Sequence, residues 1–559
     1  MPEAVSIAEL LLSRANDHGL GLIEPNGTRW SWGQLVEDSA RIAAAAGPLL
    51  DWSNPPHIGV LLPNGKEYLD WLGAAALLGA TIVGVNPTRR GEQLAADIRS
   101  VDCQLLVTDE EGAALLHGLE LGAATNNILQ VDAPSYAELL HDVEPSDIDA
   151  LIDDAAGIDP STLLLLLFTS GTTGTPKAVR CTQGRLATIA RTAGANYGFS
   201  RDDICYCPMP LFHGNAIMAL WAPALWSGAA VAPAPKFTAS GWLRDVQRTK
   251  ATKFTYVGKA ISYLLATPPS TGDRDHCVAM GFGTEASLAH RDAFASRFGI
   301  RLIEGYGSSE GGINVIATPD TPHGALGPCP PGMDVLVVDP LTSIECPRAR
   351  FDAHGQLTNA HEAIGELVNT SGGARFEGYY ERPDAEAERL RNGWYWSGDL
   401  AYRDAAGFFY FAGRNGDWLR VDSENMAAGP IEAVLSRYPN FASVLVFGVP
   451  SPAGGEEVLA AVELIEGATF NGADFSLWLT DQADLGTKWA PMFVRVVEQL
   501  PITATGKLTK VGLKAEGLDT LDPIYWTGLR RTAVYEVFDE AAKAQFVSGA
   551  SSAVEQSPE

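Results

Sequence analysis

A nine-residue segment, TSGTTGTPK at 169–177, combines residue types that together can hold a phosphate group. Gly171 and Gly174 let successive backbone N–H groups converge on an anion, because no Cβ stands in the way. Four threonines and one serine add hydroxyl donors, and Lys177 adds a positive charge. The segment departs from the Walker pattern, in which Lys follows the second glycine directly. It therefore predicts a phosphate-binding loop of another kind, entered from a buried strand at 161–168.

The loop resembles the signature of the adenylate-forming (AMP-binding) superfamily, which includes acyl-CoA synthetases, peptide-synthetase adenylation domains and firefly luciferase. The superfamily's other motifs follow in order as PMPLFHGNA (208–216), GFGTEA (281–286), EGYGSSEGG (304–312), WYWSGDL (394–400), Gly413-Arg414 and PITATGKLTK (501–510). The resemblance covers about residues 5–530. It implies that ATP and Mg²⁺ convert a carboxylic acid into an acyl-adenylate.

The resemblance also implies a nucleotide site in which Tyr306 stacks on adenine, Asp399 and Arg414 approach the ribose, and Glu310 binds Mg²⁺. These residue types suit those tasks: an aromatic ring offers dispersion area, and a hard carboxylate oxygen suits Mg²⁺. Ser309 stands where Thr is usual and keeps the hydroxyl. The full implied set for ATP or AMP is Thr169, Ser170, Gly171, Thr172, Thr173, Gly174, Lys177, Gly283, Thr284, Glu285, Tyr306, Gly307, Ser308, Ser309, Asp399 and Arg414.

Four residues are implied in catalysis: Lys507, His213, Thr169 and Glu310. The ammonium of Lys507 can bridge the substrate carboxylate and the α-phosphate as charge builds there. His213 is implied as a gate where the acyl and thiol channels join. Taken singly, such residues are more often a solvated surface lysine or a half-buried histidine. Their places in the ordered motifs favour the catalytic interpretation.

The segment GRNGDWLRVDSENMAAGPIE (413–432) resembles fatty acid transport proteins and very-long-chain acyl-CoA synthetases, whose soluble actinobacterial relatives include fatty-acid and steroid-side-chain CoA ligases. It implies CoA as second substrate and a hinge at Gly416, where glycine absorbs backbone rotation at little steric cost. Ser423 stands where many members have Gly beside the CoA tunnel. Gly214, Ala216 and Ala219 suggest room for a long or bulky acyl group.

Three alternatives stay open at this point. The chain resembles, less closely, an adenylation enzyme that loads a carrier protein and an acyl-AMP ligase that uses no CoA. A light-emitting oxidase shares the same scaffold, but no residue favours it. A non-catalytic nucleotide- or lipid-binding relative is disfavoured, because every charged catalytic candidate is present.

Composition limits the function classes. The chain has 559 residues and a formal net charge of −28, which disfavours nucleic acid and anionic lipid as partners. Its seven cysteines are odd in number and scattered, so no disulfide framework is expected. No basic segment followed by an apolar core opens the chain, and no run of about 18 apolar residues occurs, so a cytoplasmic protein without a membrane-spanning segment is predicted. Peripheral membrane contact and the oligomeric state stay open.

The elements that must position these residues follow a strand–helix–strand pattern. Examples are the strand at 57–65, the helix at 66–79 and the strand at 80–87, and the pattern returns at 251–267 and 277–307. Short strands and turns follow from about 330. The predicted fold is α/β, α+β overall: an N-terminal domain at 1–413 of helix-covered sheets with a small β-barrel-like part, a small mobile α+β domain at 414–530, and a partly frayed extension at 531–559.

Overall fold

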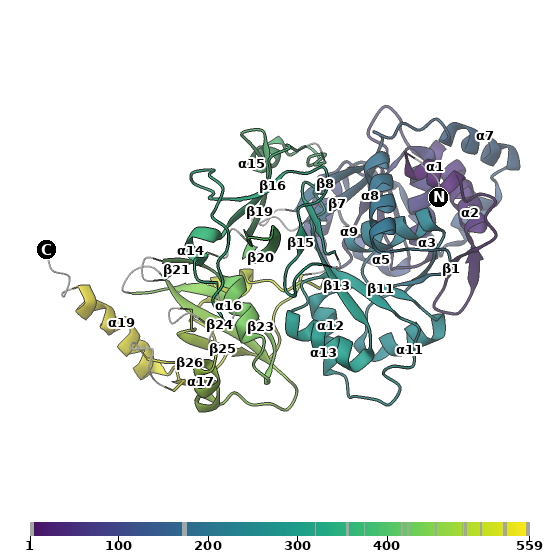
Figure 1. The fold of residues 1–559 in the computed structure, drawn as a ribbon. Helices are drawn as coiled ribbons and strands as arrows, with labels where there is room; N and C mark the ends of the chain where they lie inside the picture. The colour runs from purple at the N-terminus through teal and green to yellow at the C-terminus, as the bar shows by residue number, and fades with distance from the viewer. Residues whose placement is uncertain are drawn as a thin grey trace.

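Two helix-covered sheets form the first part of the molecule, coloured purple to teal in Figure 1. The computed structural model describes residues 5–169, 176–318, 320–353, 357–373, 375–414, 418–421, 424–452, 456–482, 485, 489–503, 506–528 and 534–554. One sheet has the strand order β6-β5-β3-β4-β7-β8 and consists of β3 (His57–Leu61), β4 (Thr81–Gly84), β5 (Leu105–Thr108), β6 (Ile128–Gln130), β7 (Leu163–Thr169) and β8 (Lys177–Thr182). Its strands are parallel except for β8.

The second sheet has eight strands in the order β14-β13-β12-β11-β9-β10-β1-β2. Its inner strands are parallel, and β2 and β14 run antiparallel at the two edges. The strands are β1 (Leu20–Ile23), β2 (Arg29–Ser31), β9 (Ile204–Cys207), β10 (Ala230–Pro233), β11 (Lys253–Val257), β12 (Met280–Thr284), β13 (Arg301–Gly307) and β14 (Asn314–Ile316).

Helices separate and cover these sheets, so the first part has five layers. The central layer contains α1 (Ile7–Leu12), α2 (Trp32–Ala46), α3 (Lys66–Leu78), α8 (Gln183–Asn196) and α10 (Ala222–Ser227). The outer layers contain α4 (Gly91–Arg99) and α5 (Glu110–Leu116) on one side, and α11 (Ala239–Thr249), α12 (Gly258–Ala266) and α13 (Leu288–Phe298) on the other. Shorter or peripheral helices are η1 (Gly47–Leu49), η2 (Gly122–Asn126), α6 (Pro134–His141), α7 (Pro145–Ala155), α9 (Gly214–Ala216) and η3 (Ile217–Trp221).

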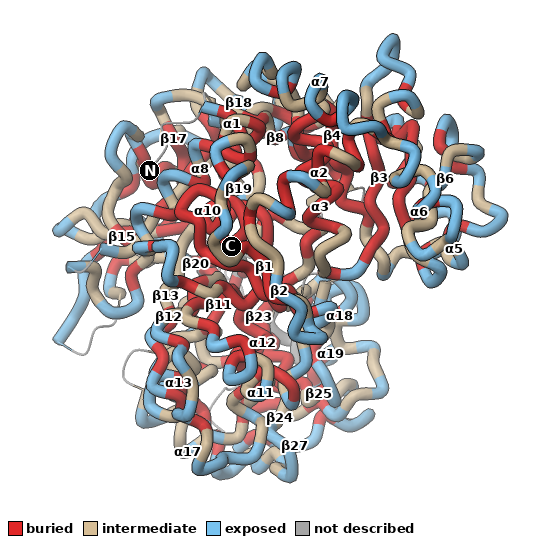
Figure 2. Tube along the Cα trace, turned by 90° about the vertical axis from the view of Figure 1, so that its right-hand side faces the viewer, coloured by how far each residue is buried: buried red, intermediate tan, exposed pale blue. Residues whose placement is uncertain are grey.

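The apolar strands are explained by burial on both faces. In β5, Leu105 and Val107 pack into the central core, whereas Leu106 packs against the outer helices. Successive side chains of a strand point to opposite faces, so a strand covered on both sides must be apolar throughout. Figure 2 shows this as continuous red through β3 and β4 with blue at the rim. The strand–helix–strand interpretation of 57–87 is therefore confirmed, with β3, α3 and β4.

A six-stranded antiparallel sheet follows, in the order β15-β20-β19-β17-β16 with β18 beside β19. It corresponds to the short strands expected from about residue 330. Its elements are β15 (Gly327–Pro328), β16 (Val335–Val338), α14 (Ala360–Ala363), β17 (Gly365–Asn369), α15 (Pro383–Arg389), β18 (Leu390–Arg391), β19 (Trp394–Arg403) and β20 (Phe408–Arg414).

The last part of the chain is a smaller α+β unit, green to yellow in Figure 1. Its five-stranded sheet has the order β23-β24-β25-β26-β27, and β21 and β22 form a separate hairpin. The elements are β21 (Trp418–Val421), β22 (Glu424–Ala427), α16 (Ala428–Leu435), β23 (Phe441–Pro450), β24 (Glu456–Leu464), α17 (Gly472–Thr480), β25 (Phe493–Val497), α18 (Val511–Glu516), β26 (Ile524–Trp526), β27 (Glu536–Val537) and α19 (Glu540–Val554).

The final helix is packed at its start and projects at its end. Phe538 and Phe546 are buried against Phe493 and Trp526 of the small sheet. The remainder of α19 extends away from the body in Figure 1. Over the described ranges, no helix combines the length and apolar character that a membrane crossing requires. The predicted α/β class with a second, smaller α+β unit is confirmed.

Candidate active site

A cleft of about 2430 Å³ lies between the two helix-covered sheets, the antiparallel sheet and the small unit, and residues from all of them line it. Three strands deliver their last residues to it: Thr169 from β7, Thr284 from β12 and Gly307 from β13. The carboxyl ends of strands are where open α/β sheets place their ligands. The topology therefore explains why motifs distant in sequence meet here.

The structure brings together every predicted site residue that it describes. The cleft is lined by Thr169, Lys177, His213, Gly283, Thr284, Glu285, Tyr306, Gly307, Ser308, Ser309, Glu310, Asp399, Arg414 and Lys507. The loop residues Ser170, Gly171, Thr172, Thr173 and Gly174, the predicted hinge Gly416 and the predicted CoA-tunnel residue Ser423 lie outside the described residues.

Lys177 sits at the end of the predicted phosphate loop, directly beside its start. Thr169 and Lys177 are paired in the antiparallel ladder of β7 and β8. The side chain of Lys177 is buried, with Nζ 3.1 Å from Oε2 of Glu388 on α15 and 5.6 Å from the ring centroid of Tyr379. The ammonium is thus held at the base of the loop by an anion that a phosphate group can replace.

The carboxylate of Glu310 is buried near Lys177 and fits a Mg²⁺ site. Its Oε1 accepts a hydrogen bond of 2.9 Å from the hydroxyl of Tyr379, and Nε of Arg389 lies 3.4 Å from that hydroxyl. Over the described residues, no cluster of three or more His, Cys, Asp or Glu side chains could hold a metal alone. Proteins commonly bind Mg²⁺ through one or two carboxylates together with substrate phosphates, so the carboxylate of Glu310 suits this ion.

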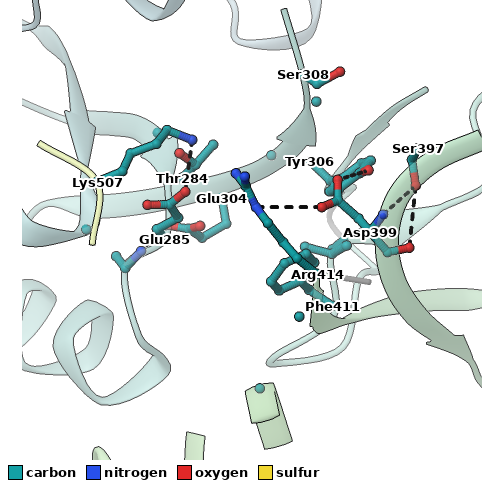
Figure 3. Close-up of a pocket in the computed structure, with 18 of the residues that line it drawn as sticks. Thr284, Glu285, Glu304, Tyr306, Ser308, Ser397, Asp399, Phe411, Arg414 and Lys507 are labelled. Carbon is teal, nitrogen blue, oxygen red and sulfur yellow. Dashed lines mark hydrogen bonds and ion pairs between the residues drawn. The ribbon is translucent and has the colours of Figure 1, made fainter. Parts of the chain in front are cut away.

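A second group of side chains surrounds Asp399 on β19. The hydroxyl of Tyr306 donates to Oδ2 of Asp399 at 2.6 Å, and Nε of Arg414 lies 3.9 Å from Oδ1 (Figure 3). Burial raises the pKa of Asp399 above its ordinary value, and the Arg414 charge opposes that shift. The ring of Tyr306 lies 6.4 Å from that of Phe411. The three polar groups and two rings can bind a ribose and a flat base side by side.

Lys507 reaches into the same cleft from the small unit. Its Nζ donates to Oε1 of Glu285 at 2.8 Å, on the opposite side of the cleft from Asp399 (Figure 3). Glu285 has a φ of 70°, a left-handed conformation that non-glycine residues adopt rarely. The turn is crowded as well, because a Cβ on Gly258 would stand 1.7 Å from the Glu285 carbonyl oxygen. The absence of a side chain at Gly258 therefore allows the backbone of Glu285 to lie this close to α12.

His213 lies directly before α9 and lines the cleft. Burial and the charge of Lys507 lower the pKa of its imidazole to about 4. The ring is therefore neutral near pH 7, so it can accept or donate a hydrogen bond without adding charge. Gly214 and Ala219 also line the cleft, but Ala216 is fully buried in the central core. Ala216 was expected to leave room for the acyl group, but it belongs to the central core and does not line the cleft.

Sequence reasoning missed three side chains of this site. Tyr379 and Glu388 contact Glu310 and Lys177, yet they lie in a segment with no recognisable binding pattern. Glu304 lines the cleft and accepts a 2.8 Å hydrogen bond from Tyr256, and burial raises its pKa to about 7. Glu304 lies two residues before Tyr306 in the motif at 304–312, so its position could have indicated that it lines the site.

Comparison with known proteins decides the family. The family model described as AMP-binding enzyme matches residues 16–380, and the model described as AMP-binding enzyme C-terminal domain matches residues 430–507. The chain belongs to the AMP-binding enzyme family. The predicted resemblance is thereby confirmed, and the order of the matched regions agrees with the two parts of the fold.

Relatives of this AMP-binding enzyme are CoA ligases. Steroid-22-oyl-CoA synthetase from Rhodococcus jostii (strain RHA1) is 52% identical over 97% of this chain and 96% of its own length. The medium/long-chain-fatty-acid–CoA ligase FadD17 from Mycobacterium tuberculosis (strain ATCC 25618 / H37Rv) is 43% identical over 94% of this chain and 99% of its own.

Solved structures agree on the fold. ATP-bound MatB from Rhodopseudomonas palustris is 23% identical with a TM-score of 0.74, covering 90% of this chain and 98% of that one. A benzoate CoA ligase from Burkholderia xenovorans LB400 is 19% identical with a TM-score of 0.78, covering 91% and 100%.

The family and its relatives fix the type of reaction. This AMP-binding enzyme is an ATP-dependent acyl-CoA synthetase, an acid–thiol ligase that uses ATP, Mg²⁺ and CoA and binds a carboxylic acid. The alternatives of a carrier-loading enzyme, a CoA-independent ligase and a non-catalytic relative are thereby set aside.

Proposed function

We propose that this acyl-CoA synthetase acts on a bulky alicyclic acid of the steroid-side-chain type. The observation that carries the proposal is the 52% identity to steroid-22-oyl-CoA synthetase over nearly the whole of both chains. The shape of the cleft supports it, because a face of α8 formed by Thr188, Ile189, Thr192 and Ala193 lines the wall together with Ala219. These side chains are small or medium in size, which leaves width for a rigid ring system.

A second candidate is a medium- or long-chain fatty acid. It is favoured by the 43% identity to FadD17 ligases over most of the chain. A flexible acyl chain and a steroid both need a deep apolar site, but they differ in width. The two candidates therefore predict different changes in activity when the acyl site is made narrower.

We further propose roles for the residues of the cleft. In the first step a carboxylate oxygen attacks the α-phosphorus of ATP, forming acyl-AMP while the bond to pyrophosphate breaks. Lys507 bridges the carboxylate and the α-phosphate, and its position in the cleft supports that role. Lys177 and the 169–177 loop hold the leaving phosphates, and Tyr306, Asp399 and Arg414 hold the nucleoside. Glu310 would hold Mg²⁺, which when bound offsets phosphate charge.

In the second step the CoA sulfur attacks the acyl carbonyl carbon, AMP leaves, and the thiol proton passes to solvent. We propose that His213, neutral by virtue of its lowered pKa, gates the junction at which the thiol arrives. We propose that the chain is divided into an N-terminal domain at 1–413, a mobile domain at 414–530 and an extension at 531–559. The mobile domain would rotate about Gly416 between the two steps, and Ser423 would lie beside the path of CoA. The need for ATP and CoA supports a cytoplasmic location.

A substrate screen tests the choice of acid. Purified enzyme with ATP, Mg²⁺ and CoA would be given steroid-side-chain acids, fatty acids of increasing length and short acids, and thioester formation would be followed by mass spectrometry. We expect the highest kcat/KM for the steroid acids. A higher value for fatty acids would replace the first candidate with the second. Replacing Ala219 by Phe should depress steroid acids more than straight-chain acids, with exposed Ala544→Phe as the control.

A further inference from the structure

The segment that carries Lys507 is tied to the first part of the molecule by an ion pair outside the group of proposed reacting residues. Lys259, in the first turn of α12, places Nζ 2.7 Å from Oε2 of Glu463 on β24. The side chains are only 1% and 13% exposed, so the pair is almost out of water. Nζ of Lys259 also lies 3.4 Å from Oγ of Ser443 on β23.

Glu463 links Lys259 to the segment that carries Lys507. The same Oε2 accepts a 2.9 Å hydrogen bond from the backbone N–H of Leu500, immediately before the segment 501–510. A second contact crosses at the same place, because Nε2 of Gln499 donates to the hydroxyl of Tyr263 at 2.5 Å. The ring of Tyr263 lies 4.9 Å from Nζ of Lys259. Two neighbouring residues at the entrance of the segment are thus fixed to α12.

We propose that Lys259 is a positioning residue for the adenylation step: through Glu463 and Leu500 it sets the segment 501–510 so that Lys507 enters the cleft. This rests on the proposed role of Lys507. α12 follows directly on β11 and starts at Gly258, the residue packed against the Glu285 turn. Two adjacent residues therefore act on the same segment. Lys259 supports its start through Glu463, and Gly258 supports the turn of Glu285, to which Lys507 bonds.

The chemistry favours a positioning role over simple stability. A buried ion pair contributes little net stability, since desolvation offsets the attraction, but it restricts geometry when both partners are fully bonded. Adenylation is sensitive to geometry, because a displacement of about 1 Å in a reacting group can cost a factor of about 100 in rate. The thioester step, for which the small unit is proposed to rotate, does not need this arrangement.

Comparing the two half-reactions tests the proposal. Adenylation is measured as acid-dependent ATP–pyrophosphate exchange, and thioester formation is measured from chemically prepared acyl-AMP and CoA. For Lys259→Met we expect kcat of exchange to fall about 10- to 100-fold, with the KM for ATP and the thioester rate changed less than about twofold. Lys259→Arg should restore part of the exchange, because it keeps the charge. Glu463→Gln, which keeps an acceptor for Leu500, should lose less than Lys259→Met.

A buried ion pair within the small unit provides the matched control. Arg495 on β25 is 3% exposed and donates from Nε to Oδ2 of Asp522 at 2.8 Å, with Glu516 as a further partner. Arg495→Met should lower the melting temperature while leaving the ratio of the two half-reaction rates unchanged. If Lys259→Met behaves in the same way, the pair is merely structural and the proposal is overturned.

Further variants test the proposal even if Lys259→Met does not fold. If Lys259→Met does not fold, Glu463→Gln and Gln499→Ala must lower exchange relative to thioester formation, and an unchanged ratio in both overturns the proposal. Lys507→Ala separates this proposal from the function on which it rests. Intact exchange in Lys507→Ala refutes the role of Lys507 itself. Loss of exchange there, with normal exchange in Lys259→Met, refutes only the positioning role.

Discussion

Three cations of the cleft each lie against a carboxylate. Lys177 faces Glu388 and Lys507 faces Glu285, while Arg414 lies near Asp399. The side chains of Glu388 and Glu285 are 62% and 40% exposed, so water reaches the carboxylate of each lysine pair and screens the attraction in part. Screened pairs exchange partners at small cost. In the proposed mechanism, Glu388 and Glu285 therefore keep the two lysines in place until ATP and the substrate bind.

The role of Lys507 predicts a selective loss. Lys507→Ala should lower adenylate formation about 100- to 1000-fold, because one preorganised charge aimed at the reacting phosphate is removed. Thioester formation from prepared acyl-AMP should be retained. Exchange and thioester assays check this, with the partly exposed Lys543→Ala on α19 as control. Equal losses in both half-reactions would contradict the assignment.

In the proposed mechanism, Glu310 is the carboxylate that would hold Mg²⁺. Glu310→Gln should raise the Mg²⁺ concentration for half-maximal exchange at least about tenfold, because a neutral amide oxygen attracts Mg²⁺ less than a carboxylate does. Titration with MgCl₂ at fixed ATP measures the change, and chelation with EDTA should abolish exchange in the unmodified enzyme. Glu362→Gln on the surface of α14 is the control. An unchanged titration curve would rule out Glu310 as the ligand.

His213 gives a pH dependence with a definite sign. Its pKa is about 4 in the folded protein, below the ordinary 6.5, so the unfolded chain binds the proton more readily. This contribution to stability is present above pH 6.5 and is lost as the pH falls toward 4. Between pH 6.5 and 4, the unfolding free energy of His213→Gln should therefore fall less steeply than that of the unmodified enzyme. The difference is at most about 1.4 kcal/mol for each pH unit, and it is smaller than this limit because the ring lines the cleft.

Urea unfolding at pH 7.5, 6.5, 5.5 and 4.5 measures this slope. His290, whose pKa burial also lowers to about 4, keeps its contribution in both proteins and cancels from the difference. Exposed His18→Gln serves as control. Parallel curves for the His213 variant and the unmodified enzyme would show that this imidazole is not shielded as described.

At the residue scale, types and order predicted the members of the cleft but not their partners. Lys507 and Glu285 are 222 positions apart, and Lys259 and Glu463 are 204 apart. No local pattern links such pairs, because they meet only when the small unit docks on α12. Ala216 illustrates the converse error: a small side chain in a matched motif faced the core instead of the cleft.

At the element scale, the strands buried on both faces were the easiest to predict. Residues 58–61 and 163–168 carry no polar side chain, and each run lies in a strand of the first sheet. The antiparallel sheet was harder, because strands such as β15 and β18 are two residues long and exist only through pairing with β20 and β19. Helix α19 lies in the stretch expected to be partly frayed, yet Phe546 anchors it in the small core.

The junction of β11 and α12 predicts a sensitive glycine. Gly258→Ala would place a Cβ 1.7 Å from the Glu285 carbonyl oxygen, so the turn carrying Glu285 must move. We expect a loss of about 1–3 kcal/mol in unfolding free energy, as for overpacked cores, together with slower adenylation. Gly65→Ala is the control, since a Cβ there meets nothing within 4 Å. Equal stability of the two variants would refute the close approach.

At the scale of the whole molecule, charge is distributed unevenly. The chain has 40 Lys and Arg against 68 Asp and Glu, for a net charge of −28. Among the described residues that line the cleft, twelve are Lys or Arg and nine are Asp or Glu. The cleft is therefore slightly positive inside a strongly negative protein. ATP and CoA are both anions, so the net charge of the protein repels them while the lining of the cleft attracts them.

This contrast predicts how salt affects ATP capture. The Debye length is about 10 Å at 0.1 M salt, so an approaching ATP responds mainly to the cleft and little to the distant acidic surface. Raising KCl from about 0.1 M to about 0.5 M should screen that attraction and lower kcat/KM for ATP about two- to tenfold, with kcat at saturating ATP nearly constant. Initial-rate assays at fixed free Mg²⁺ measure both constants, with sucrose at equal osmolality as control. A rise in kcat/KM with salt would mean that the net charge of the whole surface, not the cleft, governs encounter with the nucleotide.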